Sequence, residues 1–164
     1  MPIAATITWV VTAACGLYLL TIWLIEYDRE FQSVAATRLP VPVISTHALL
    51  AITGMILWTV FLMTGAQNME WLVAAILTVV FILGTIMVVR WIGVYRAYRA
   101  RSRRAHAAVP VPVGAGYGAT RAGLGHRAAI PPERHFPVTV VILHGVFAVV
   151  TFVLVLLSAL NHLT

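Results

Sequence analysis

The chain has 164 residues, of which 61% are hydrophobic and 10% are charged, and its formal net charge is +6. Soluble globular domains average about 25% charged residues, so this composition excludes a soluble domain and indicates a polytopic membrane protein. Neither base-stacking aromatics nor a recognition helix accompanies the positive charge, so we expect no binding to nucleic acid.

Four segments are apolar over the length that crosses a bilayer, which is about 20 residues. In chain order they cover residues 3–25, 41–64, 71–89 and 136–160. Little of the chain is left over for a soluble domain, so we predict a single membrane domain over residues 1–164. Its fold class is all-α, a polytopic membrane four-helix bundle in contact with membrane lipid.

The basic residues are unevenly distributed among the connections. All 11 are arginine, which favours a GC-rich genome, and we expect a bacterial plasma membrane. Nine of the 11 lie between Arg90 and Arg134, whereas the connection 65–70 carries only Glu70 as a charge. Because short basic connections stay in the cytoplasm, we expect the third-to-fourth connection inside and both termini outside.

Residues 96–134 form a predicted basic, Pro- and Gly-rich cytoplasmic loop. Its first part is expected to continue the third helix beyond the membrane, because Arg96, Arg99 and Arg103 recur at helical spacing. Such arginines anchor the inner end of a span. They are also suited to anionic lipid head groups or to an acidic partner.

Two stretches, 39–51 and 136–148, align without a gap and share Pro, two Val, His and Ala. Each places a histidine, His47 or His144, seven residues after the aligned proline. An ionisable side chain within a span is a functional candidate by default. The second and fourth spans enter from the same side, so the two histidines are expected at one depth, in a parallel two-helix repeat.

Small residues follow each histidine on the same helix face. They are Ala51 and Gly54 on the second span, and Ala148 and Thr151 on the fourth. Small side chains let a bulky group or a neighbouring helix approach closely, and the sequence leaves both alternatives open.

The four spans with His47 and His144 resemble four-helix membrane b-type cytochromes and the haem-bearing anchor subunits of respiratory oxidoreductases. The resemblance implies one haem b between the two histidines, since neutral imidazole is an axial ligand of haem iron. This chain departs from the two-haem members of these families, which carry four haem ligands. Arg38, Arg90 and Arg134 lie near the expected inner surface, where they would meet haem propionates or anchor the spans.

The resemblance implies an electron relay between quinol or quinone and a redox partner, in a larger membrane redox complex or a homo-oligomer. The chain would then be at most an electron-transfer subunit of an oxidoreductase. The alternative is a non-catalytic accessory or assembly subunit. In such a subunit the histidines would only form hydrogen bonds between helices of the bundle. A metal or proton site and a transporter are weaker hypotheses, since the spans contain no carboxylate and two histidines are too few for a closed zinc site.

Overall fold

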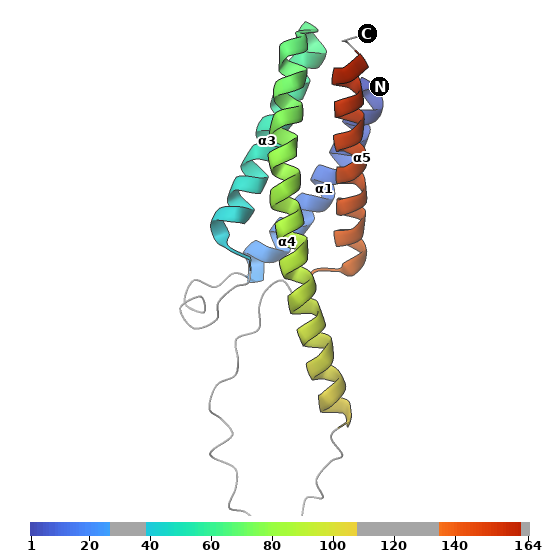
Figure 1. Ribbon diagram of the computed structural model, residues 1–164. Helices are drawn as coiled ribbons and strands as arrows, with labels where there is room; N and C mark the ends of the chain where they lie inside the picture. The colour runs from blue at the N-terminus through green and yellow to red at the C-terminus, as the bar shows by residue number, and fades with distance from the viewer. Residues whose placement is uncertain (27–38, 108–134, 162–164) are drawn as a thin grey trace, which may run out of the picture.

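The computed structural model describes residues 1–26, 39–107 and 135–161, and these ranges contain no β-strand. The described residues form four helices, shown in Figure 1: α1 (Pro2–Glu26), α3 (Val41–Thr64), α4 (Gln67–Ala107) and α5 (Val138–Asn161). Each is long and apolar enough to cross a membrane. The prediction of an all-α bundle of four candidate membrane spans is therefore confirmed.

Prolines mark the starts of the two helices that carry the histidines. The amides of Val43 and Ile44 donate to the carbonyl of Pro40, and those of Val140 and Val141 donate to the carbonyl of Pro137. Proline is tolerated at a helix start because its missing N–H would have no partner there. The two stretches that align in sequence therefore begin their helices in the same way.

The turn between α3 and α4 is tight. Gly65 ends α3 with a positive φ of 67° and donates its amide to the carbonyl of Phe61 at 2.8 Å. A left-handed residue after a helix favours glycine, which has no Cβ to clash. α4 begins at Gln67, four residues before the predicted span, and runs without interruption to Ala107, so residues 96–107 of the predicted loop are helical.

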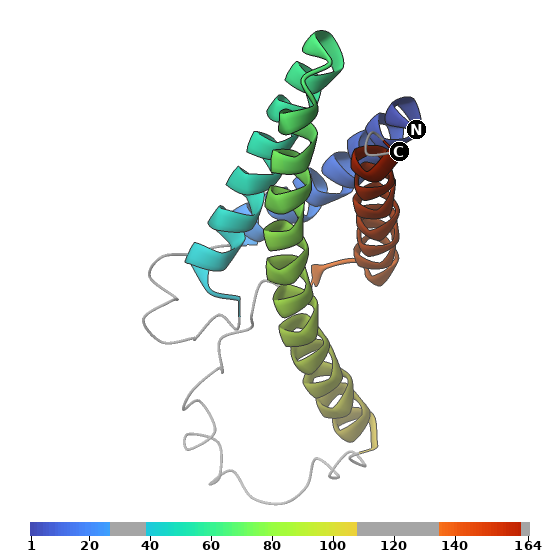
Figure 2. The same ribbon diagram turned by 45° about the horizontal axis from the view of Figure 1, so that its top comes forward.

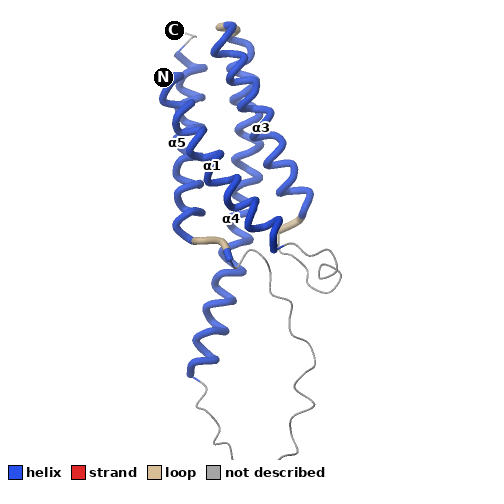
Figure 3. Tube along the Cα trace, turned by 180° about the vertical axis from the view of Figure 1, so that it is seen from behind, coloured by secondary structure: helices blue, strands red, loops and turns tan. Residues whose placement is uncertain are grey.

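The helices form two pairs. α3 packs against α4 and α1 against α5, while α4 also contacts α5 and α1 meets α3 over a short stretch. Figure 2 shows the two pairs, and in the rear view of Figure 3 α1 descends from beside the end of α5 towards the start of α3. α3 and α5 begin at the same end, which we call the base, and α4 continues beyond it.

Two hydrophobic clusters close the ends of the bundle. The cluster far from the base contains Trp9, Trp58 and Phe61, and the basal cluster contains Trp23 and Ile44. Large apolar side chains on the outside of all four helices are exposed. This is the pattern expected where lipid, rather than water, surrounds the bundle.

Candidate functional site

His47 of α3 points into the bundle and bonds to a neighbouring helix. Its Nδ1 lies 3.0 Å from the carbonyl oxygen of Val80 on α4. A carbonyl oxygen only accepts hydrogen bonds, so Nδ1 carries the hydrogen and donates it. The lone pair of the ring is then on Nε2.

His144 of α5 makes the equivalent bond to the other neighbour. Its Nδ1 lies 3.0 Å from the carbonyl oxygen of Thr12 on α1. The same argument places its hydrogen on Nδ1 and its lone pair on Nε2. Both imidazoles therefore donate from Nδ1, and each is oriented by a backbone carbonyl as metal-binding histidines usually are.

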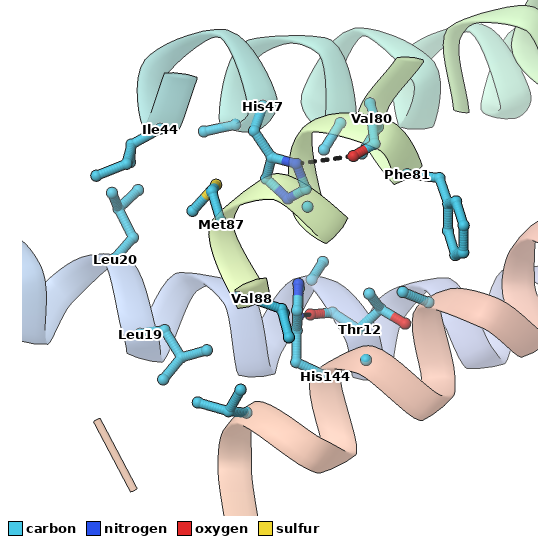
Figure 4. Close-up of a pocket in the computed structure, with 18 of the residues that line it drawn as sticks. Thr12, Leu19, Leu20, Ile44, His47, Val80, Phe81, Met87, Val88 and His144 are labelled. Carbon is cyan, nitrogen blue, oxygen red and sulfur yellow. Dashed lines mark hydrogen bonds between the residues drawn. The ribbon is translucent and has the colours of Figure 1, made fainter. Parts of the chain in front are cut away.

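The two imidazole rings lie close together, with the edge of one directed towards the other. Their centroids are 6.3 Å apart and their planes meet at 61°. Figure 4 shows the nitrogens that do not bond to carbonyls directed into the space between the rings. A nitrogen–zinc bond to histidine is about 2.0–2.1 Å long and a ring centroid lies about 1.1 Å behind its nitrogen, so two imidazoles on opposite sides of such an ion have centroids roughly 6.3 Å apart.

Each imidazole lies against a glycine of the helix that accepts its hydrogen bond. A Cβ built on Gly16 would be 2.9 Å from Cε1 of His144, and one built on Gly84 would be 3.1 Å from Cε1 of His47. Real Cβ atoms essentially never come as close as the first of these distances. The positions of both rings therefore depend on the absence of a side chain at these two residues.

A cavity of about 520 Å³ surrounds the two histidines and is lined by all four helices. Its volume is within the range of about 300–1,000 Å³ typical of cofactor and ligand sites. Small residues account for much of the free space around the rings: Ala13, Gly16, Ala48, Ala51, Gly84, Gly145 and Ala148. No charged side chain lines this cavity within the ranges 1–26, 39–107 and 135–161.

Of the four small residues expected beside the histidines, three line the cavity: Ala51, Ala148 and Thr151. The hydroxyl of Thr151 is 3.0 Å from that of Thr8 and 2.8 Å from the carbonyl of Phe147. Gly54 does not line the cavity. It is buried against the indole of Trp9, so its small size admits a neighbouring side chain.

Only one of the three arginines expected near haem propionates, Arg90, lies within the described residues. Arg90 is exposed and is not among the residues that line the cavity. Arg38 and Arg134 lie outside the described residues. Buried tryptophans, Trp23 and Trp91, line the basal end of the cavity instead.

Sequence reasoning missed Gly16 and Gly84, which carry no ionisable group. A signal for them exists in the sequence, because each is followed after seven residues by a tryptophan, Trp23 or Trp91. The accepting carbonyls of Thr12 and Val80 belong to the backbone. Every residue type has such a carbonyl, so the sequence gives no signal for these two.

A metal site built from protein side chains alone has little support. In the described part of the chain, no group of three or more His, Cys, Asp or Glu side chains converges. Closed zinc sites usually require four ligands. Two opposed imidazoles suit a metal whose remaining ligands come from a cofactor.

Comparisons with protein-family models, with curated proteins and with solved structures found no match to this chain.

Proposed function

We propose that this chain is a membrane b-type cytochrome, or the haem-bearing subunit of a larger membrane redox complex, with His47 and His144 as axial ligands of one haem b. The observation that carries the proposal is the opposition of two imidazoles from different helices, with centroids 6.3 Å apart. This separation supports the proposal because it is close to that expected for one ion between two ring nitrogens. The nitrogens in question are the Nε2 atoms, because each Nδ1 is bonded to a carbonyl.

The residues around the histidines fit a flat apolar group. Ala51 and Ala148 leave room beside the rings, and the remaining wall is almost entirely apolar. A bound haem b supplies reversible one-electron chemistry at its iron. The protein's part is to hold the ligands, exclude water and lower the local dielectric constant.

The proposed role is electron relay between quinol or quinone and a redox partner, in a larger membrane complex or a homo-oligomer. Arg96, Arg99 and Arg104 are exposed on the part of α4 that extends beyond the base, which favours docking of an acidic surface there. We further propose that this end is cytoplasmic in a bacterial plasma membrane, with both termini outside, by the positive-inside rule. The parallel two-helix repeat proposed from sequence is supported by the common direction of α3 and α5.

A non-catalytic accessory subunit is the second candidate. It is favoured by the two interhelical hydrogen bonds of the histidines, which join α3 to α4 and α5 to α1 without any cofactor. Such bonds stabilise membrane helix pairs by about 0.6 to 2 kcal/mol.

Absorption spectra separate the two candidates. The purified full-length protein, supplied with haemin, is measured oxidised and then reduced with dithionite. We expect a b-type spectrum that is lost or converted to a five-coordinate form in His47→Ala and in His144→Ala. The control is His135→Ala, an exposed histidine that does not line the cavity, and its spectrum should match the wild type.

A folded protein that takes up no haemin in a titration would overturn the cytochrome proposal and favour the accessory subunit. Haem uptake that persists unchanged in the double variant His47→Ala/His144→Ala would also overturn it. Circular dichroism of each variant distinguishes a missing ligand from a missing fold.

A further inference from the structure

The four helices divide into two sequence units with the same plan. In each unit the first helix carries a glycine seven residues before a tryptophan: Gly16 and Trp23 on α1, Gly84 and Trp91 on α4. The second helix of each unit, α3 or α5, carries the histidine. Unit one is therefore α1 with α3, and unit two is α4 with α5.

Corresponding residues of the two units occupy corresponding places in the structure. Both tryptophans are buried and line the basal end of the cavity. Both glycines lie one helical turn after the carbonyl that accepts a histidine Nδ1–H, Thr12 before Gly16 and Val80 before Gly84. We call each carbonyl–glycine combination a seat, defined as Thr12/Gly16 in unit one and Val80/Gly84 in unit two.

Each histidine lies on the seat of the other unit. His47 of unit one contacts Gly84 and bonds to Val80, and His144 of unit two contacts Gly16 and bonds to Thr12. We infer that the site is a reciprocal clamp, in which each unit supplies one imidazole ligand and the seat that positions the ligand of the other unit. The inference rests on the proposed function only for the identity of the group that the imidazoles bind.

The seats act through two contacts of different kinds. The carbonyl holds the hydrogen on Nδ1, although neutral histidine in water mostly carries it on Nε2. The glycine lets the Cε1 edge of the ring lie against the helix backbone. Together they direct Nε2 into the space between the rings, so Gly16 and Gly84 are positioning residues rather than ligands.

The clamp predicts that a change in the seat of one unit affects the histidine of the other unit. The histidine ¹⁵N NMR spectrum of the purified full chain measures this effect, and His47→Ala and His144→Ala assign its signals. Gly16→Ala should shift the signals of His144, and Gly84→Ala those of His47. The controls Cys15→Ala and Ile82→Ala change neighbouring side chains that do not line the cavity, and should shift neither. Alanine has a higher helix propensity than glycine, so Gly16→Ala and Gly84→Ala do not lower the helix propensity of α1 or α4.

The inference is overturned if each glycine variant perturbs the histidine of its own unit, both histidines equally, or neither. If a glycine variant does not fold, the wild-type spectrum still tests the clamp, because both histidines must carry their hydrogen on Nδ1. Two histidines with hydrogen on Nε2 would overturn it.

Haem titration provides a second readout. Disturbing the residue that orients a metal ligand typically lowers affinity about 10–100-fold, and we expect losses of this size for Gly16→Ala and Gly84→Ala. In a His144→Ala background, Gly84→Ala should still weaken haem binding and Gly16→Ala should have no further effect. A wild type that binds no haem refutes the proposed function and leaves the NMR result standing. Haem binding that neither glycine variant alters refutes the clamp alone.

Discussion

Trp58 of α3 donates its indole N–H to the hydroxyl of Thr6 on α1, at 2.9 Å, and its side chain is 1% exposed. The bond joins two helices that otherwise meet over a short stretch. It lies in the cluster far from the base, where the ring of Trp58 also contacts those of Trp9 and Phe61. Of these residues, Trp9 also lines the cavity.

We predict that Trp58→Phe destabilises the bundle by about 1 kcal/mol or more, because it removes an interhelical hydrogen bond and part of a buried ring. Thermal unfolding in detergent, followed by circular dichroism, measures the change. The matched control is Trp71→Phe, since Trp71 is 40% exposed on α4. An equal loss of stability in both variants would contradict a special role for Trp58.

A second prediction concerns Gly54. A Cβ at this position would be 3.2 Å from Cζ2 of Trp9, so Gly54→Ala should force the indole to move. Overpacking costs about 1–3 kcal/mol, and the better helix propensity of alanine offsets about 1 kcal/mol of it. We expect a small net loss of stability together with a shift in tryptophan fluorescence.

Gly145→Ala is the control for this substitution, because nothing lies within 4 Å of a Cβ built there. It should keep or raise the unfolding temperature and leave the fluorescence unchanged. The packing of Gly54 against Trp9 would be refuted by a Gly54→Ala variant that is more stable than wild type and has an unaltered emission spectrum.

Gly54 also illustrates what could be predicted from the sequence. His47 and His144 were expected at one depth because both follow an aligned proline on helices that run in the same direction, and their ring centroids are 6.3 Å apart. Periodicity gives the face of a helix but not the occupant of the space beside it. At Gly54 that occupant is Trp9, from a helix whose crossing angle no sequence pattern specifies.

The two seats, Thr12/Gly16 and Val80/Gly84, could not be predicted from the sequence for a different reason. The atoms that orient the histidines are backbone carbonyls of Thr12 and Val80, and every residue has one. Only the three-dimensional packing of α5 on α1 and of α3 on α4 selects these two. The extent of α4 was underestimated at its start, because the polar residues Gln67, Asn68 and Glu70 precede the apolar segment but belong to the same helix.

The third prediction concerns the space beside the histidines. Ala51→Leu and Ala148→Leu add three carbons each at positions that line the cavity. We expect each to lower haem uptake at least about tenfold while the helix content stays unchanged, because steric exclusion acts on the bound state only. Ala14→Leu, at an exposed position of α1 outside the cavity, should bind like the wild type. Equal uptake by all three variants would place the haem elsewhere.

The fourth prediction concerns Thr151, a polar residue that lines the cavity. Thr151→Val preserves the shape of the side chain and removes a hydroxyl that bonds to Thr8 and Phe147. The hydroxyl of Thr8 keeps its bonds to the carbonyls of Ala4 and Ala5, so no group loses its last partner. We expect a loss of stability below about 1 kcal/mol and an unchanged haem spectrum. A lost spectrum with an intact fold would assign Thr151 a direct role in cofactor binding.

The last prediction concerns orientation. Asn68 is exposed in the first turn of α4, and Arg103 is exposed on the part of α4 beyond the base, so the two lie at opposite ends of this helix. Single cysteines, Asn68→Cys or Arg103→Cys, are introduced after Cys15→Ser has removed the natural thiol. With the base in the cytoplasm, a membrane-impermeant maleimide should label Asn68→Cys in intact cells and Arg103→Cys only after permeabilisation. The reverse pattern would place the arginine-rich end of α4 outside and would refute the proposed orientation.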